Sequence, residues 1–366
     1  VYKNSGEITN SYTKMSVNSK DNAGGFVNKN FGTIKNSKSI GDVNGFNCVG
    51  GFVCENFGRI ENSTTAISVD YGKCVGGFCG SNEGVIVASK SESNAIAYSS
   101  TSDTKCGGFV GNNKKGEIIS CISTGNAKGQ EYVGGFCGDN IGQILDSKAE
   151  GDVTAKTVSN TNRCGGFIGE NRGIVKDSYA KGNATGEEYV GGFAGVNKSD
   201  ISGCYAIGKA TAKTKTHTAL AGGFVGENEK GTIANCTATG GAGARSSSGL
   251  AKAGGFVGIN KSSIVSSKAS GYVYLSAGTC YKDNGCGGFV GNNDKGGNID
   301  GCYAEATLET TNKKKGGGFV GEAKSNSIIR NSKCISTILL KDGNTKKAEF
   351  CYDKSKKAVI ENCNAE

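Results

Sequence analysis

The feature that most constrains this sequence is a Gly-Gly-Phe tripeptide that recurs along its length. Successive phenylalanines stand 26–33 residues apart. They are Phe26, Phe52, Phe78, Phe109, Phe136, Phe167, Phe193, Phe224, Phe256, Phe289 and Phe319. A recurrence of this length is typical of proteins built from stacked units, each of which buries its apolar face against the next. The repeat therefore outweighs chain length as a guide to domain number.

A second column of the repeat is asparagine, which stands four residues after the phenylalanine in ten of the eleven copies. Its members are Asn30, Asn56, Asn82, Asn113, Asn140, Asn171, Asn197, Asn228, Asn260 and Asn293. Asparagine tolerates left-handed backbone and hydrogen-bonds to its own turn. Amides stacked in successive units can also form a ladder. We expect this column to mark a corner of each unit.

The rest of each unit has the residue pattern of a β-strand. An aliphatic residue is followed three positions later by Ser or Cys, and then small residues alternate with polar ones, as in 233–240. Alternation with a period of two is the pattern of a half-buried strand. No segment shows the sustained helical period and caps of an α-helix. Parallel pairing of equivalent strands from unit to unit would satisfy the backbone hydrogen bonds of such a chain.

The predicted fold class is therefore all-β, a single-stranded parallel β-helix (β-solenoid) with almost no helix. We expect about 11–12 coils of 26–33 residues. The whole of 1–366 is predicted to be one continuous solenoid, with a partial first coil at 1–22 and a degenerate, lysine-rich last coil at 341–366. The chain starts at Val1 inside a repeat, which we interpret as a piece of a longer protein.

The direction of the phenylalanine rings is left open by the sequence. The residues three before and one after each Phe are mostly small or aliphatic and share one parity, whereas Phe has the other. A regular strand cannot bury both sets. Either the Gly-Gly pair bulges and turns Phe inward, or the rings form an outward ladder. We favour inward rings, because eleven exposed phenylalanines would exceed the apolar patch of an ordinary monomer.

Composition and charge argue against a membrane-spanning protein and against a nucleic-acid-binding protein. There is no run of about 20 apolar residues, so no membrane span is predicted. The net charge is +9, and the last 57 residues hold 12 basic and 6 acidic side chains. Lysine at the end of a sheet commonly blocks edge pairing. A polyanion contact is the alternative, but no interleaved aromatics suggest base stacking, so nucleic acid is not an expected partner.

Sixteen cysteines would ordinarily suggest disulfides or metal sites. Eleven of them replace Ser, Val or Ala in repeat columns and are interpreted as small buried residues. Cys48 and Cys74 hold equivalent positions in neighbouring units, where the expected strand spacing permits a disulfide. No Cys-x-x-Cys pair occurs, so no zinc or other metal site is predicted.

The sequence gives little support for a catalytic or cofactor-binding site. The single histidine, His217, lies in a predicted loop, and no phosphate-loop or dinucleotide fingerprint is present. We therefore predict no catalytic residues, no cofactor and no enzyme activity. Segments of variable length precede some Gly-Gly-Phe copies, and the longest are 209–220, 241–252 and 274–285. We expect them to be loops on one face of the solenoid, where a glycan or protein ligand would bind.

The repeat in 222–240 resembles the GLUG repeat family, through the order Gly-Gly-Phe-Val-Gly-x-Asn, then Gly-x-Ile, then Ser or Cys, Ala and Gly. The central apolar residue here is Phe where that family typically has Leu. Such repeats occur in large bacterial surface proteins, including filamentous-haemagglutinin-like adhesins and the non-catalytic part of IgA-cleaving metallopeptidases. The resemblance implies a parallel β-helix in an extracellular or cell-surface protein, and it brings no catalytic residues.

The function expected from these observations is a non-catalytic structural or adhesive module of a larger secreted or cell-surface protein. A self-assembling fibre subunit that stacks end to end is the first alternative, because exposed coil ends can pair with other chains. A carbohydrate-processing β-helix enzyme is the second.

Overall fold

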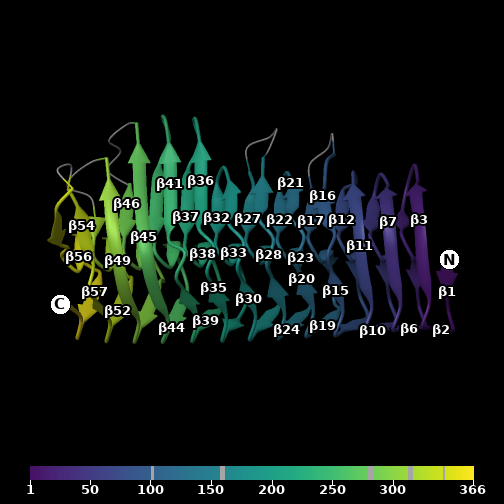
Figure 1. Cartoon of the computed structure of the whole chain (residues 1–366). Coiled ribbons are helices and arrows are strands. Elements are labelled where there is room, and N and C mark those ends of the chain that lie inside the picture. The colour runs from purple at the N-terminus through teal and green to yellow at the C-terminus, as the bar shows by residue number, and fades with distance from the viewer. Residues whose placement is uncertain (100–102, 157–160, 279–283, 312–315, 341–342) are drawn as a thin grey trace. The chain divides into compact units, whose positions relative to one another are not determined.

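The computed structural model describes residues 1–99, 103–156, 161–278, 284–311, 316–340 and 343–366. Within these residues every helix or strand assigned is a β-strand, and the strands stack in parallel from coil to coil (Figure 1). This confirms the predicted parallel β-solenoid. The chain divides into two compact units, Val1–Gly182 and Asn183–Glu366. The single continuous solenoid over 1–366 stays a prediction.

Each full coil contributes short strands to four sheets, here called A, B, C and D. In unit 1, sheet A contains β1 (Lys3–Asn4), β5 (Val27–Asn30), β9 (Val53–Asn56), β13 (Cys79–Asn82), β18 (Val110–Asn113), β23 (Cys137–Asn140) and β28 (Ile168–Asn171). Sheet B contains β2 (Glu7–Thr9), β6 (Thr33–Lys35), β10 (Arg59–Glu61), β14 (Val85–Val87), β19 (Glu117–Ile119), β24 (Gln143–Leu145) and β29 (Ile174–Lys176).

Sheet C carries the alternating segment predicted from the sequence. In unit 1 it contains β3 (Tyr12–Asn18), β7 (Lys38–Asn44), β11 (Thr64–Asp70), β15 (Lys90–Ser91), β16 (Asn94–Ile96), β20 (Ile122–Ser123), β21 (Ala127–Gly129), β25 (Lys148–Ala149), β26 (Val153–Ala155) and β30 (Tyr179–Ala180). Sheet D contains β4 (Ala23–Gly24), β8 (Cys48–Gly50), β12 (Cys74–Gly76), β17 (Lys105–Gly107), β22 (Tyr132–Gly134) and β27 (Arg163–Gly165).

Unit 2 repeats the same four-sheet plan. Its sheet A contains β33 (Ala194–Asn197), β38 (Val225–Asn228), β43 (Val257–Asn260), β47 (Val290–Asn293), β51 (Val320–Ala323) and β56 (Cys351–Lys354). Sheet B contains β34 (Ile201–Ser202), β39 (Thr232–Ala234), β44 (Ser263–Val265), β48 (Asn298–Asp300), β52 (Ile328–Arg330) and β57 (Val359–Glu361).

The remaining strands of unit 2 belong to sheets C and D. Sheet C contains β31 (Ala184–Gly186), β35 (Tyr205–Ala206), β36 (Ala210–Thr214), β40 (Thr237–Ala238), β41 (Ala242–Ser246), β45 (Lys268–Ala277), β49 (Tyr303–Thr310), β53 (Lys333–Cys334), β54 (Thr337–Leu339), β55 (Thr345–Lys347) and β58 (Asn364–Ala365). Sheet D contains β32 (Tyr189–Gly191), β37 (Ala219–Gly222), β42 (Ala251–Gly254), β46 (Gly285–Gly287) and β50 (Gly316–Gly317).

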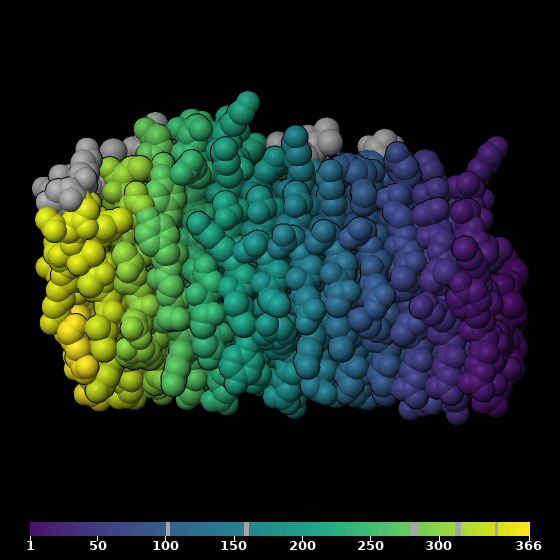
Figure 2. All heavy atoms as spheres, in the orientation of Figure 1, coloured from purple at the N-terminus to yellow at the C-terminus, as the bar shows by residue number. Residues whose placement is uncertain are grey.

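Register is set by the repeat itself. Equivalent residues face one another across neighbouring coils, as Ile60 faces both Ile34 and Ile86 in sheet B. The aliphatic residues of this column from Ile34 to Ile329 are buried, so a slip of one residue would expose the whole file. In Figure 2 the coils of unit 1, coloured purple to teal, pack closely against one another.

The last coil departs from the pattern. Within 341–366, β55 pairs with β54 in antiparallel fashion, the one such pairing among the described strands. Residues 341–342 lie outside the described residues. No helix within the described ranges is long and apolar enough to cross a membrane.

Candidate functional site

The phenylalanine column forms an interior stack in each unit. All eleven rings predicted from the repeat are buried. Neighbouring rings within unit 1 stack with centroids 4.7–4.9 Å apart, and those within unit 2 at 4.8 Å. Phe350, which precedes the degenerate coil's β56, continues the stack of unit 2 on Phe319 at 4.8 Å. The rings therefore belong to the core and are not a surface for ligands.

The parity conflict is resolved by a bend and not by a bulge within one strand. Sheet D ends at Gly50 and sheet A begins at Val53, so Gly51 and Phe52 form a corner between them. A side chain on Gly50 would collide with the carbonyl oxygen of Val53, and one on Gly51 with the carbonyl of Gly77 in the next coil. The two glycines thus permit a corner that turns Phe52 inward. The inference of a strand bulge is wrong on this point.

The asparagine column forms the amide ladder that the sequence suggested. Within each unit the Nδ2 of one asparagine donates to the Oδ1 of the next at 2.8–3.0 Å. All ten side chains are buried. Asn4, which the repeat alignment missed, begins the ladder by donating to Asn30 at 2.8 Å. Each buried amide is satisfied by its neighbours, which is the condition for burying a polar side chain.

Left-handed backbone occurs in a different column from the one expected. None of the ten ladder asparagines has a positive φ, whereas the residue before each Ser or Cys does. This column reads Asn10, Asn36, Asn62, Ala88, Ser120, Asp146, Asp177, Gly203, Asn235, Ser266, Gly301, Asn331 and Asn362. Asn, Asp and Gly adopt this conformation most readily. That bias was visible in the sequence and identifies the corner between sheets B and C.

The disulfide considered between Cys48 and Cys74 does not form. The two residues are in register on β8 and β12, but both are free thiols. Each sulfur instead donates within its own coil, Cys48 to the Cys54 carbonyl at 3.2 Å and Cys74 to the Gly80 carbonyl at 3.1 Å. Side chains in register on parallel strands leave the backbone in the same direction, which does not favour a disulfide between them.

The long insertions are mostly strand and not loop, which corrects the sequence prediction. In 209–220 the chain forms β36, a turn and the start of β37, and in 241–252 it forms β41, a turn and the start of β42. In 274–285, β45 continues to Ala277, and residues 279–283 lie outside the described residues. Because β36, β41 and β45 pair in register, the inserted residues extend sheet C.

Raising the pH is expected to destabilise the chain through its buried thiols. Burial raises the pKa of Cys106, Cys121, Cys286 and Cys302 to about 12, from an ordinary value of 9.0. The folded chain holds these protons more tightly than the unfolded chain. The stability that they contribute is therefore complete below about pH 9 and is lost as the pH rises toward about 12.

The measurement is the urea midpoint at about pH 8 and about pH 10, which we expect to fall between the two. Cys121→Ser is the matched control, because serine occupies this column in other coils and does not titrate in this range. Its midpoint should fall less than that of the parent chain. Equal falls would contradict the assignment to buried thiols.

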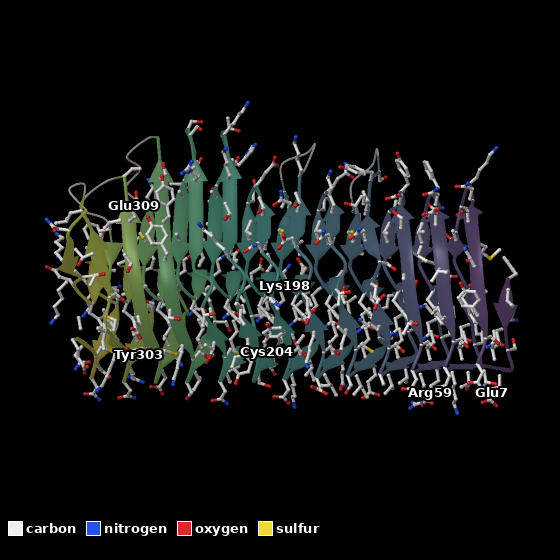
Figure 3. The ribbon with its side chains drawn as sticks, in the orientation of Figure 1. Glu7, Arg59, Lys198, Cys204, Tyr303 and Glu309 are labelled. Atoms are coloured by element: carbon white, nitrogen blue, oxygen red, sulfur yellow. The ribbon has the colours of Figure 1, made fainter. Side chains whose placement is uncertain are left out.

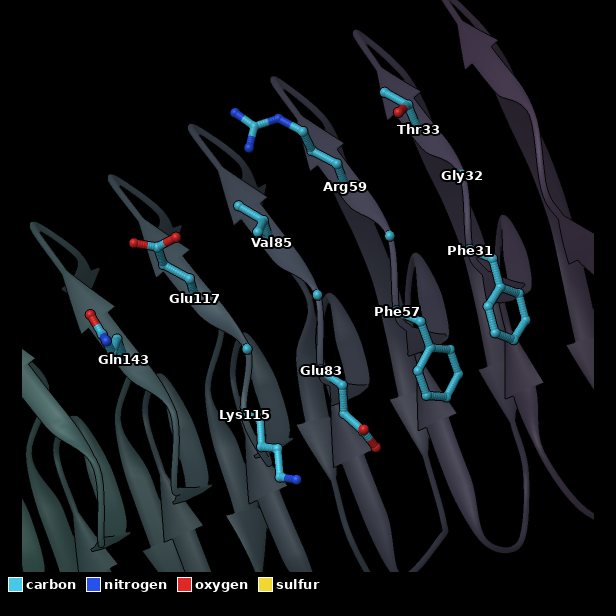
Figure 4. A pocket seen from close by; sticks show the side chains of 13 residues that line it. Phe31, Gly32, Thr33, Phe57, Arg59, Glu83, Val85, Lys115, Glu117 and Gln143 are labelled. Carbon is cyan, nitrogen blue, oxygen red and sulfur yellow. The ribbon is translucent and has the colours of Figure 1, made fainter.

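A groove on the outer surface of unit 1 is the candidate functional site. It crosses successive coils at the turn between sheets A and B and has a volume of about 690 Å³. Its floor is a file of glycines, Gly32, Gly58, Gly84 and Gly116. One row of side chains begins with Phe31 and Phe57, and the facing row lies on sheet B (Figure 4). Figure 3 shows Arg59 of this facing row, and Glu7 two coils away, both at the edge of the molecule.

Two phenylalanines in this groove are exposed, unlike those of the repeat column. Phe31 is 48% exposed and Phe57 is 39% exposed. Their rings stack with centroids 4.8 Å apart and planes inclined by 9°, and Figure 4 shows them side by side with their faces turned the same way. Sequence reasoning missed them, although the signal was present as Asn-Phe-Gly at 30–32 and again at 56–58.

The glycine floor is required by the stacking of coils. A side chain at Gly58 would meet the carbonyl oxygen of Gly32 in the preceding coil, and one at Gly84 would meet that of Gly58. Backbone atoms cannot move aside without breaking the ladder between coils. The column therefore excludes side chains, and the groove between the two rows stays open.

A second charged cluster lies on the outer face of sheets A and D in unit 1 and shares no residue with the groove. Arg172 donates to the buried carboxylate of Asp139 and lies 3.4 Å from Glu170, which in turn pairs with Arg163 at 2.7 Å. Arg163 also lies over the ring of Tyr132 at 4.7 Å. These charges neutralise one another, which indicates a role in holding neighbouring coils together.

Comparison with known proteins gives one match, and it falls in unit 2. No curated protein and no solved structure matches the chain. The family model of the GLUG motif matches residues 217–242, a segment that runs from the turn before β37 to the start of β41. One coil of this β-solenoid thus carries a GLUG motif, as the resemblance in the sequence suggested.

Proposed function

We propose that this chain is a non-catalytic adhesive module of a larger secreted or cell-surface protein. In this proposal the stacked coils form a rigid support, and the groove of unit 1 binds the ligand. The observation that carries the proposal is the exposed pair Phe31 and Phe57, whose rings are held side by side in the groove. Aromatic side chains dominate the energetics of binding sites, and rigid ones lose little entropy on binding.

The position of the pair also supports binding. Loops commonly carry ligand contacts because a rigid framework holds them in place. Phe31 and Phe57 stand in the short turn between two sheets whose register is fixed on both sides by buried columns. The rings are therefore preorganised, which lowers the cost of binding.

Beads coated with the purified chain should adhere to cell monolayers, and beads coated with the double variant Phe31→Ala, Phe57→Ala should adhere much less. Phe46→Ala is the matched control, because Phe46 is 64% exposed but lies outside the groove. Equal adhesion by all three, or none by the parent chain, would contradict the proposal. Antibody against the chain should also label intact producing cells, and labelling only after permeabilisation would count against surface exposure.

A further inference from the structure

We infer that the groove of unit 1 takes a neutral, linear oligosaccharide that lies along the direction in which the coils stack. This inference rests on the proposed function and names the chemical class of its ligand. It depends on five features of the groove: its aromatic pair, its open floor, its balanced charge, its available polar side chains and its satisfied backbone.

The floor and the aromatic pair fit a chain of sugar rings. The glycine file gives a flat strip that crosses four coils without side chains, and it continues past the two rings of Phe31 and Phe57. A sugar ring has an apolar face of C–H groups that packs on an aromatic face, and its hydroxyls remain free at the edge. Lys3 Nζ lies over the ring of Phe31 at 5.1 Å, so we assign this packing mainly to Phe57. A pyranose unit in an extended chain is about as long as the rise from one coil to the next, so successive units would meet equivalent positions.

The charges of the groove are balanced. Two basic side chains, Arg59 and Lys115, and two acidic ones, Glu83 and Glu117, line it. Arg59 is paired with Glu61, and Glu83 lies 3.2 Å from Lys114, so much of this charge is already compensated. A polyanion would be drawn to an excess of basic side chains, which this groove lacks. Charge complementarity therefore favours a neutral ligand.

Three polar side chains remain available to hydroxyl groups. Thr33, Glu117 and Gln143 line the groove, and their side chains make no hydrogen bond or ion pair within the part of the chain that the structure describes. They stand on β6, β19 and β24, in the row that faces the phenylalanines (Figure 4). A few well-placed polar groups beside an apolar surface give a site both orientation and specificity.

A peptide fits this groove less well. Extended peptides bind mainly by adding a strand to unpaired backbone groups. Here the backbone beside the floor is already hydrogen-bonded from coil to coil, as Arg59 N donates to Gly32 O at 2.9 Å and Val85 N to Gly58 O at 2.9 Å. Glu117 N and Gln143 N donate in the same way at 2.9 and 3.0 Å. Recognition must therefore come from side chains, which favours a glycan.

The test is binding of the whole chain to cellohexaose, chitohexaose, xylohexaose and mannohexaose, measured by calorimetry, with heparin and an arrayed peptide library as rival ligands. We expect at least one neutral oligosaccharide to bind, with little change between low and moderate salt. Phe57→Ala should weaken that binding by about tenfold or more. Phe46→Ala should leave it unchanged, and circular dichroism should be the same for both variants.

The outcomes separate the ligand class from the adhesive role. If beads adhere through Phe31 and Phe57 but no neutral oligosaccharide binds, the inference of a neutral glycan is overturned and adhesion stands. Salt-sensitive binding to heparin that depends on Phe57, or peptide binding that depends on it, would also overturn the inference. If a neutral oligosaccharide binds at Phe57 but beads do not adhere to cells, the ligand class is supported and the adhesive function fails.

Discussion

Replacing Phe136 with alanine is expected to destabilise the chain by about 3–5 kcal/mol, the usual cost of removing a buried phenylalanine. The ring is fully buried and stacks on Phe109 and Phe167 at 4.8 Å on either side. The cavity cannot close by collapse, because the backbones that flank it are fixed by the ladder between coils. The variant therefore loses the transfer free energy of the buried ring and also carries the cost of the cavity that remains.

Hydrogen exchange read by mass spectrometry is the suitable measurement, because stacked repeats open locally and do not always unfold in one step. Protection should fall most in the peptides around residue 136 and in the two neighbouring coils. Phe46→Ala, at an exposed position, should change stability by less than about 0.5 kcal/mol. If the two variants lose similar protection, the ring stack does not hold the coils together.

Replacing Asn113 with alanine is expected to cost about 2–5 kcal/mol, since it leaves buried polar groups unsatisfied. The Asn113 amide donates to Asn140 Oδ1 at 2.8 Å and to Gly116 O at 3.1 Å, and it accepts from Asn82 Nδ2 at 3.0 Å. Removing it takes a partner from one buried donor, Asn82 Nδ2, and from two acceptors, Asn140 Oδ1 and Gly116 O. The substitution also interrupts a ladder whose members polarise one another.

The adjacent residue provides a matched control. Asn112 lies on the opposite face of β18, and its Oδ1 has no hydrogen-bond partner among the described residues. Asn112→Ala should therefore change the urea midpoint little, or raise it slightly, whereas Asn113→Ala should lower it clearly. A result in which both substitutions have the same effect would show that the amide ladder does not stabilise the stack.

Much of this fold could be predicted because identical columns repeat many times. The spacing of Gly-Gly-Phe fixed the coil, and the alternation after each Ser or Cys located sheet C. The corner at Gly51 and Phe52 was not predicted, since a period of two cannot distinguish a bent chain from a straight strand. The left-handed corner was assigned to Asn30 and its equivalents because asparagine is common in both columns, whereas the structure places it at Asn36 and its equivalents.

The candidate site was harder to predict than the fold. Phe31 and Phe57 occur in only two neighbouring coils, so they do not form a repeat column. Their exposure depends on the turn between sheets A and B, which fold-level reasoning does not resolve. The segments expected to bind ligand, 209–220 and 241–252, were chosen because their lengths vary, but added residues on paired strands simply widen a sheet.

The direction of the hydrogen bonds gives each unit an anisotropic response to force. The bonds that join coils, including the asparagine ladder, run along the stacking direction. Tension along that direction pulls each coil away from the next, and the boundaries between coils bear the same load one after another. Coils would therefore detach one at a time and at modest force. A sideways load on one coil is instead shared among four sheets, which would have to shear together. A ligand in the groove of unit 1 that is pulled sideways, across the coils, would load this stronger direction.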